Sequence, residues 1–140
     1  MPRIEVLDWE AARTEAARIR MIVFVEEQRV PAEIEMDDQD AASLHALAYV
    51  DGKAVGTGRL LPDGHIGRMA VLKERRASGV GGAILARLVE EARRRGVKEV
   101  VLSAQTHALG FYRRHGFREQ GEIFEEAGIA HQEMRRVLNS

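Results

Sequence analysis

Residues 75–82 carry the clearest chemical signal in the sequence, a glycine-rich stretch that leads into an amphipathic segment. The stretch reads Arg-Arg-Ala-Ser-Gly-Val-Gly-Gly, and its glycines let the backbone approach a ligand because no Cβ stands in the way. A helix is predicted to begin at Val80. Its first amides lack intrahelical partners and lie at the positive end of the helix dipole, where phosphate oxygens bind well. We therefore predict a phosphate site formed by Arg76, Ser78, Gly79, Val80, Gly81 and Gly82.

Two common phosphate-binding motifs do not fit this stretch. A dinucleotide fingerprint requires G-x-G-x-x-G, but counting from Gly79 the third glycine position is occupied by Ile84. A P-loop requires Gly-Lys-Ser/Thr at the start of the helix, and none follows. The residues alone therefore leave two interpretations open: a phosphate-binding α/β enzyme of another kind, or an ordinary loop that enters a helix.

Hydrophobic periodicity and turn residues predict ten elements around the stretch. Strands are predicted at 4–7, 44–50, 53–61, 65–72, 99–104, 118–124 and 129–137, and helices at 9–25, 80–95 and 107–115. This order, β-α-β-β-β-α-β-α-β-β, indicates an α/β (α+β) fold with a mixed central sheet and helices packed on its faces. The helical crossover predicts that strands 65–72 and 99–104 are parallel, with the second buried on both faces. Residues 26–43 are predicted to be mostly loop.

Length and composition indicate one globular domain over residues 1–140. Hydrophobic residues make up 45% and charged residues 31%. No apolar run approaches the ~20 residues that span a bilayer, and the N-terminus lacks a signal-peptide core, so we expect a cytoplasmic protein without membrane contact. The chain has no cysteine, which excludes disulfides, a thiolate zinc site and a cysteine nucleophile. The five histidines show no metal-ligand spacing, so no metal is expected.

Charge is nearly balanced overall but uneven along the chain. The net charge of −1 argues against nucleic acid as a partner, and the glutamates on the basic helix face at 87–98 argue against it locally. Residues 26–40 hold seven acidic side chains and one basic one. This acidic segment is interpreted either as a solvated surface or as a rim that attracts a cation.

Arg76-x-x-Gly79-x-Gly81 matches the R/Q-x-x-G-x-G/A signature that GNAT acetyltransferases use for the pyrophosphate of coenzyme A. The match extends in both directions. Upstream, HIGRMAVLKERR resembles that family's strand before the loop, and downstream VVLSAQTHALGFYRRHGF resembles its fifth strand and following helix. The segments IRMIVFVEEQRVPAEIEMDDQD and GIAHQEMRR resemble the ElaA-like branch. The resemblance covers nearly the whole chain.

The resemblance implies an N-acetyltransferase that moves the acetyl group of acetyl-CoA to an amine, either a small molecule or a protein amino group. In this family the pantetheine arm pairs with a strand, here Met69, Ala70 and Val71, and the amide of Ala70 or Val71 would polarise the thioester. Tyr112 matches the tyrosine that contacts the cofactor and protonates the departing thiolate. Ser78 and Ser103 have no evident activating partner, so direct attack in a ternary complex is expected rather than a covalent intermediate.

The resemblance leaves the general base and the acceptor open. His65 occupies a position where some family members carry a carboxylate, and a histidine can accept a proton near neutral pH. Glu27, Glu33, Glu35 and Asp37 are rival bases that would also attract a cationic substrate. His107 and His131 are expected to line the acceptor pocket, although a packed histidine is the commoner role.

A second hypothesis is a GNAT-fold module that binds an acyl-CoA as a sensor without turnover. The intact Tyr112 and glycine stretch favour the enzyme, although both kinds of protein would bind the cofactor. The resemblance also suggests a homodimer. The sequence does not identify the acceptor amine or the acyl groups used.

Overall fold

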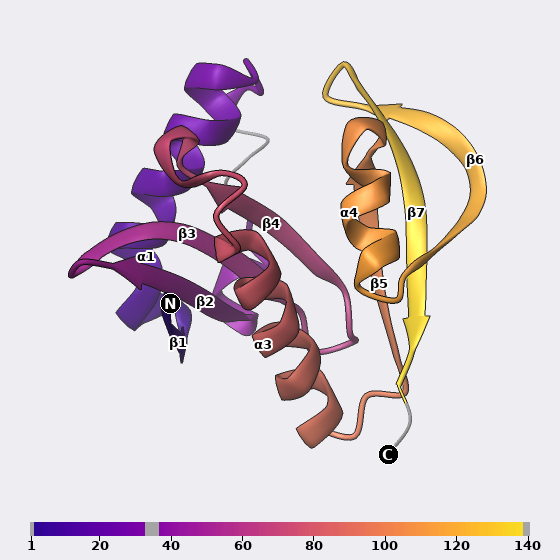
Figure 1. Ribbon diagram of the computed structural model, residues 1–140, viewed down its shortest axis with the longest axis horizontal. Helices are drawn as coiled ribbons and strands as arrows, with labels where there is room; N and C mark the ends of the chain where they lie inside the picture. Colours follow the sequence, from indigo (N-terminus) through magenta and orange to yellow (C-terminus); the bar gives the residue numbers. More distant parts are fainter. Residues whose placement is uncertain (1, 33–36, 139–140) are drawn as a thin grey trace.

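Two antiparallel sheets lie side by side in the computed structural model, which describes residues 2–32 and 37–138 (Figure 1). The first contains β1 (Arg3–Leu7), β2 (Leu44–Val50), β3 (Lys53–Leu60) and β4 (Ile66–Val71) in that order. The second contains β5 (Glu99–Gln105), β7 (Ile129–Val137) and β6 (Arg118–Glu126) in that order. Asp51 and Gly52 both have positive φ, 52° and 78°, as the predicted two-residue hairpin turn requires.

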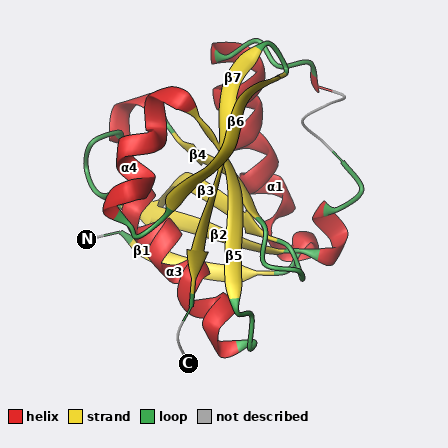
Figure 2. Cartoon of the chain, turned by 90° about the vertical axis from the view of Figure 1, so that its right-hand side faces the viewer, coloured by secondary structure: helices red, strands yellow, loops and turns green. Residues whose placement is uncertain are grey.

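Helices α1 (Trp9–Arg20) and α3 (Val80–Arg94) cover opposite faces of the first sheet (Figures 1 and 2). Strand β2 supplies both interfaces because its side chains alternate: Leu47 packs with α1, while Ala46 and Ala48 belong to the core under α3. Helix α4 (Leu109–Arg114) packs against the second sheet. Three short helical turns are η2 (Asp40–Ala42), η3 (Lys73–Arg75) and η4 (Thr106–Ala108).

Two glycines of β3 allow α3 to lie close to the sheet. A Cβ on Gly56 would be 2.8 Å from Ile84 Cδ1, and a Cβ on Gly58 would be 2.9 Å from Leu88 Cδ1. Both distances are shorter than real carbon contacts, so a side chain at either position would push the helix away. The height of α3 above β3 therefore depends on these two glycines.

Among the described residues, the hydrogen-bonded pairing of the β4 segment with β5 is confined to one end. Their contact is a parallel bridge between His65 and Val101, where Val101 N donates to Gly64 O over 3.2 Å. A bulge in β4, in which Arg68 and Met69 face the single residue Gly58 of β3, then alters the course of β4. The predicted parallel pair thus exists as a single bridge, beyond which the two strands diverge.

The order of elements agrees with the sequence prediction, and the fold class is confirmed. One difference lies after α1, where residues 21–25, predicted to continue the helix, belong to a π-helical segment, η1 (Met21–Glu27), which extends into the predicted loop by Glu26 and Glu27. The apolar run Met21–Val25 packs on the first sheet through Val23, which is buried. Within the described residues no helix combines the length and the apolar character needed to cross a membrane.

Candidate active site

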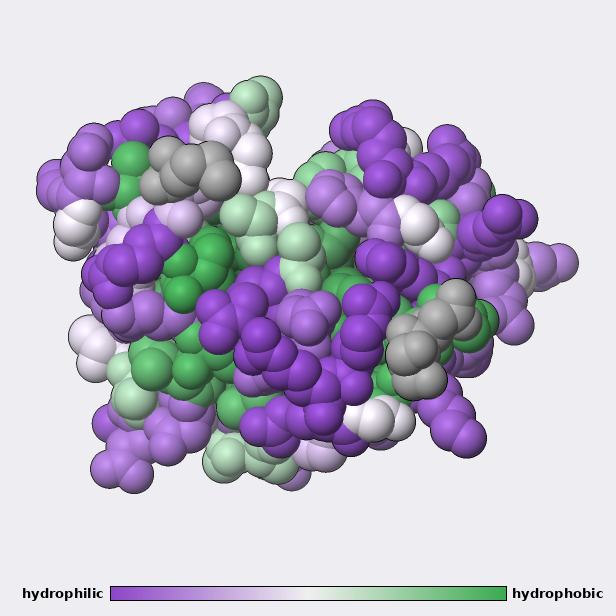
Figure 3. Space-filling view, turned by 60° about the horizontal axis from the view of Figure 1, so that its bottom comes forward, coloured by the Kyte–Doolittle hydropathy of each residue, from purple (hydrophilic) through white to green (hydrophobic). Residues whose placement is uncertain are grey.

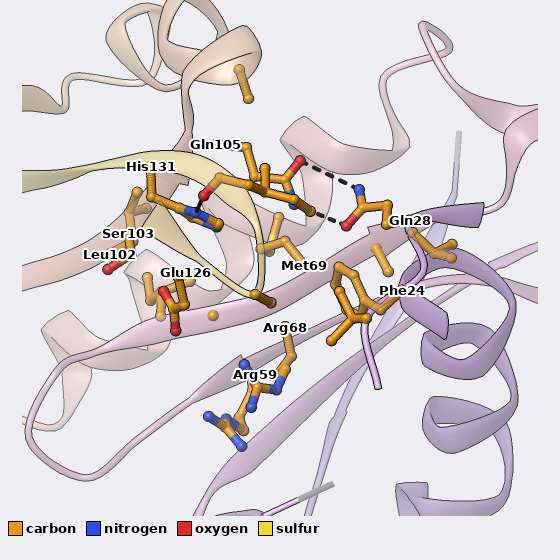
Figure 4. A pocket seen from close by; sticks show the side chains of 18 of the residues that line it. Phe24, Gln28, Arg59, Arg68, Met69, Leu102, Ser103, Gln105, Glu126 and His131 are labelled. Atoms are coloured by element: carbon orange, nitrogen blue, oxygen red, sulfur yellow. Dashed lines mark hydrogen bonds between the residues drawn. The ribbon is translucent and has the colours of Figure 1, made fainter. Parts of the chain in front are cut away.

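Two clefts meet where β4 and β5 diverge. The glycine cleft, of about 650 Å³, is lined by Gly79, Gly81 and Gly82 at the start of α3 and by Arg75, Arg114 and His115. The histidine cleft, of about 510 Å³, is lined by His65, His107 and His131 together with Phe24, Gln28 and Gln105 (Figure 4). Both clefts share one wall, formed by Met69, Ala70, Val71, Arg76, Ala108 and Tyr112. Figure 3 shows a notch between the two halves of the molecule on a largely hydrophilic face.

The glycine cleft exposes uncapped amides of α3. Gly79 precedes the helix with φ of 90°, and no side chain caps the first turn. A Cβ on Gly79 would meet nothing within 4 Å, and one on Gly81 would lie 3.6 Å from Phe111 Cζ. Internal packing therefore does not require glycine at these positions, in contrast to Gly56 and Gly58. With Arg75 and Arg114 beside them, these amides form a place suited to an anion.

Val71 directs its backbone groups into the gap between β4 and β5. Leu72 N donates to Val55 O of β3 over 2.8 Å, and successive strand residues turn their backbone groups to opposite sides. The carbonyl of Val71 accordingly faces away from β3 and accepts a hydrogen bond from Arg76 Nε (3.0 Å). The same guanidinium donates through Nη2 to Glu27 Oε1 over 2.8 Å. Arg76 therefore connects the edge of β4 to the end of η1.

Tyr112 stands in the wall between the clefts. Its ring packs edge-on against Phe111 and Phe117, with centroid distances of 5.0 and 6.0 Å. Burial raises the pKa of Tyr112 to about 12. Among the described residues, none is hydrogen-bonded to its hydroxyl. The phenol is thus protonated at neutral pH and has a hydrogen to donate to a group in the cleft.

Two histidines of the histidine cleft hold their Nδ1 hydrogens in place. His65 Nδ1 donates to Asp63 Oδ1 over 2.9 Å, and the backbone amide of His65 together with this side-chain bond lowers the pKa of the Asp63 carboxyl. His131 Nδ1 donates to the carbonyl of Ile129 over 2.7 Å. In each neutral ring Nε2 is left as an acceptor, the form that a general base requires.

Gln28 and Gln105 bridge the histidine cleft from opposite halves of the molecule. Gln105 Nε2 donates to Gln28 Oε1 over 2.9 Å, and Gln28 Nε2 donates back over 3.3 Å (Figure 4). His107 Nε2 donates to Gln105 Oε1 over 2.7 Å, so this exposed histidine orients the amide pair. The pair joins η1 to the end of β5.

In the acidic segment at 26–40, Asp37 and Asp40 form ion pairs with arginines of the same chain. Asp40 receives two hydrogen bonds from the buried Arg20, at 2.9 and 3.1 Å, and one from Arg59. Asp37 bonds to Arg59 (2.8 Å) and Arg68 (3.0 Å). Burial raises the pKa of Asp37, but its bonds and charges from the two arginines outweigh this, and the pKa is lowered. Asp37 is therefore a poor general base, and the interpretation of this segment as a plain cation-attracting rim is wrong for Asp37 and Asp40.

The Acetyltransferase (GNAT) domain family model matches residues 12–138. The chain belongs to the GNAT acetyltransferase family. It is 42% identical to a Bacillus subtilis protein named as an uncharacterized N-acetyltransferase, YjcF, over 87% of this chain and 90% of that protein. It is 32% identical to Escherichia coli ElaA, over 86% of this chain and 84% of ElaA.

Solved structures agree with the GNAT assignment. An acyl-CoA N-acyltransferase from Pseudomonas aeruginosa superposes with a TM-score of 0.87 and 29% identity, covering 98% of this chain and 100% of that one. The crystal structure of E. coli ElaA also gives a TM-score of 0.87, with 28% identity, covering 97% and 99% of the two chains. The family and these relatives support acyl transfer from coenzyme A as the general activity.

Most of the GNAT site residues predicted from the sequence line one or both clefts. The glycine cleft takes in Arg76, Gly79, Gly81 and Gly82, the shared wall also contains Met69, Ala70, Val71 and Tyr112, and the histidine cleft takes in His65, His107 and His131. Three other residues line neither cleft: Ser78 donates to the carbonyl of Arg75, Val80 is buried in the core, and Glu27 is paired with Arg76. Glu33 and Glu35 lie outside the described residues.

Several residues of the two clefts were missed by sequence reasoning. Gln28, Gln105 and Arg68 line the histidine cleft, and Arg114 and His115 line the glycine cleft. Arg114 and His115 fall inside the segment VVLSAQTHALGFYRRHGF, so the resemblance gave their location without a role. The two glutamines are 77 residues apart and carry no local signal.

Proposed function

We propose that this chain is an acetyl-CoA-dependent N-acetyltransferase that acts on an amine by direct attack in a ternary complex. The observation that carries the proposal is the meeting of the two clefts at a shared wall that contains both Val71 and Tyr112. An acyl donor held in the glycine cleft would present its thioester at this wall. An amine in the histidine cleft would approach the same point from the other side.

The glycine cleft fits the diphosphate of coenzyme A. Uncapped amides at Gly79–Gly81 supply hydrogen-bond donors, and the arginines supply positive charge. In the gap beside β4, the backbone of Val71 is free to pair with the pantetheine arm once Arg76 leaves its carbonyl. Because the backbone of Val71 faces the gap, its amide is a better candidate than that of Ala70 to polarise the thioester carbonyl.

The proton transfers are assigned to residues on the two sides of the wall. As the amine nitrogen bonds to the carbonyl carbon and the carbon–sulfur bond breaks, Tyr112 donates its hydrogen to the sulfur. A phenol with a pKa of about 12 is a weaker acid than a free thiol, of pKa ~8.5, by roughly 5 kcal/mol of proton-transfer free energy. Tyr112 would therefore act most effectively while the thiolate is still enclosed, since enclosure raises the pKa of the thiol as well.

The base that accepts the proton of the amine is proposed to be a histidine of the histidine cleft. His65 is held by Asp63 and His131 by the carbonyl of Ile129, and each presents an acceptor Nε2 when neutral. His65 is the residue indicated by the family position. Separate His65→Gln and His131→Gln variants would identify the base, since loss of the correct residue removes the rise of kcat/KM with increasing pH that a general base produces.

A thiol-release assay tests the proposal directly. The protein has no cysteine, so a thiol-reactive chromophore reports only the free coenzyme A that is formed. Acetyl-CoA is supplied with a panel of putrescine, spermidine, lysine and a lysine-containing tripeptide. Thiol release that depends on an added amine supports the enzyme. Tight binding of acetyl-CoA with no amine-dependent release would instead support the sensor hypothesis.

A further inference from the structure

An ion pair joins Arg76, which lines both clefts, to Glu27, which lines neither. Arg76 Nη2 lies 2.8 Å from Glu27 Oε1 at the end of η1. Phe24 and Gln28, on either side of Glu27 in the sequence, line the histidine cleft. In the described part of the chain Glu27 has no other cationic partner. The carboxylate therefore stands at the edge of the histidine cleft, neutralised by a residue of the other cleft.

Both contacts of Arg76 are ones that a coenzyme A molecule would compete for. The hydrogen bond from Arg76 Nε occupies the carbonyl of Val71, a backbone group that a strand-like pantetheine arm would use. The guanidinium is also the natural partner of a diphosphate, with which it can form two parallel charged hydrogen bonds. The side chains of Arg76 and Glu27 are 42% and 30% exposed. An ion pair with this much solvent access changes a binding equilibrium by no more than about fivefold. A bound diphosphate is thus able to draw Arg76 away.

We propose that Glu27 is the carboxylate that holds the acceptor as its ammonium ion, and that Arg76 occupies this carboxylate until an acyl donor binds. The inference rests on the proposed function. Departure of Arg76 leaves a negative charge beside the histidine cleft at the moment when a thioester is present. Donor and amine then favour each other's binding, and by linkage the effect has the same size in both directions.

The variant Glu27→Gln separates this role from a structural one because two measurements move in opposite directions. Calorimetric titration with coenzyme A alone should show about threefold to fivefold tighter binding, since Arg76 is no longer held by the carboxylate. The KM of the fastest amine of the thiol-release panel should rise by about threefold to fivefold, with kcat at saturating amine unchanged. Glu26→Gln is the matched control, because it removes the same charge from the neighbouring, exposed position and should change neither value.

Three results would overturn the inference. Weaker coenzyme A binding by Glu27→Gln would mean that the pair supports the donor site. An unchanged KM would mean that Glu27 does not contact the amine, and equal effects of Glu26→Gln would reduce the result to general surface charge. Failure of the proposed function looks different, because the wild-type protein itself would then bind no coenzyme A or would bind acetyl-CoA without amine-dependent thiol release.

Discussion

Replacing Gly81 with alanine is expected to stabilise the protein and to weaken its binding of coenzyme A. Gly81 is the second residue of α3, and a Cβ there would lie 3.6 Å from Phe111 Cζ and 3.7 Å from Val71 Cγ2, which are ordinary contacts. Alanine thus fits the fold. Exchange of glycine for alanine in a helix contributes about 0.5 to 1 kcal/mol to stability, or roughly 2 to 4 °C in melting temperature for a chain of this size.

The same methyl group lies in the glycine cleft, which Gly81 lines. It would keep the diphosphate from reaching the amides of the first turn. Loss of two charge-assisted hydrogen bonds of about 1.5 to 3 kcal/mol each gives about 3 to 6 kcal/mol. This corresponds to a roughly 10²- to 10⁴-fold increase in the Kd for coenzyme A.

The two effects are measured by thermal unfolding without ligand and by calorimetric titration with coenzyme A. Gly110→Ala is a close control, because Gly110 is also the second residue of its helix, α4, and its Cβ would meet only Arg114 Nη1 at 3.7 Å. Gly110 lines neither cleft, so this variant should gain stability without losing affinity. If Gly81→Ala bound coenzyme A as well as Gly110→Ala does, the amides of α3 would not be the diphosphate site.

Three further predictions concern the general acid Tyr112, the packing of α3 on β3, and the pH dependence of stability. Tyr112→Phe should lower kcat about 10²-fold and change the Kd for coenzyme A less than twofold, and unchanged turnover would assign the thiolate's proton to another group. Gly58→Ala should cost about 1 to 3 kcal/mol of unfolding free energy, because its Cβ would be 2.7 Å from Met69 Sδ. Gly67→Ala, with no atom within 4 Å of its Cβ, should be nearly neutral, and equal urea midpoints for the two variants would contradict the packing argument. Burial lowers the pKa of His45 below 6.5, so the unfolded chain takes up a proton first as the pH falls, and stability should decrease below pH 6.5. His45→Gln should reduce that slope by up to about 1.4 kcal/mol per pH unit, whereas identical urea-unfolding slopes from pH 7.5 to 5 would exclude His45 as a source.

Local signals in the sequence were sufficient for most elements and for the glycine cleft. The Asp51-Gly52 turn and the start of α3 at Val80 were predicted where the structure has them. These features depend on neighbouring residues, since turn chemistry and helix periodicity act over a few positions. The same holds for the exposed amides after Gly79.

Features that depend on distant residues could not be predicted. The bulge at Arg68 and Met69 arises from register against β3 and leaves no mark in the local pattern. The ion pair of Asp40 with Arg20 forms across 20 residues. In the sequence that aspartate looks like part of a solvated acidic run, because burial is a property of the folded chain. The pairing of Arg76 with Glu27, 49 residues apart, is of the same kind.

The two glycines of β3 have a consequence for comparing relatives of this protein. Neither glycine lines the glycine cleft, yet both set how far α3 lies from β3. A relative could keep every residue of the R/Q-x-x-G-x-G/A signature and still carry alanine or serine at the position of Gly56 or Gly58. The diphosphate of its bound acetyl-CoA would then lie farther from β4, and the thioester would not reach the amine. The distance between β3 and α3 thus depends on residues outside the signature. Two relatives that match in the loop sequence alone can therefore differ in the geometry of their active sites.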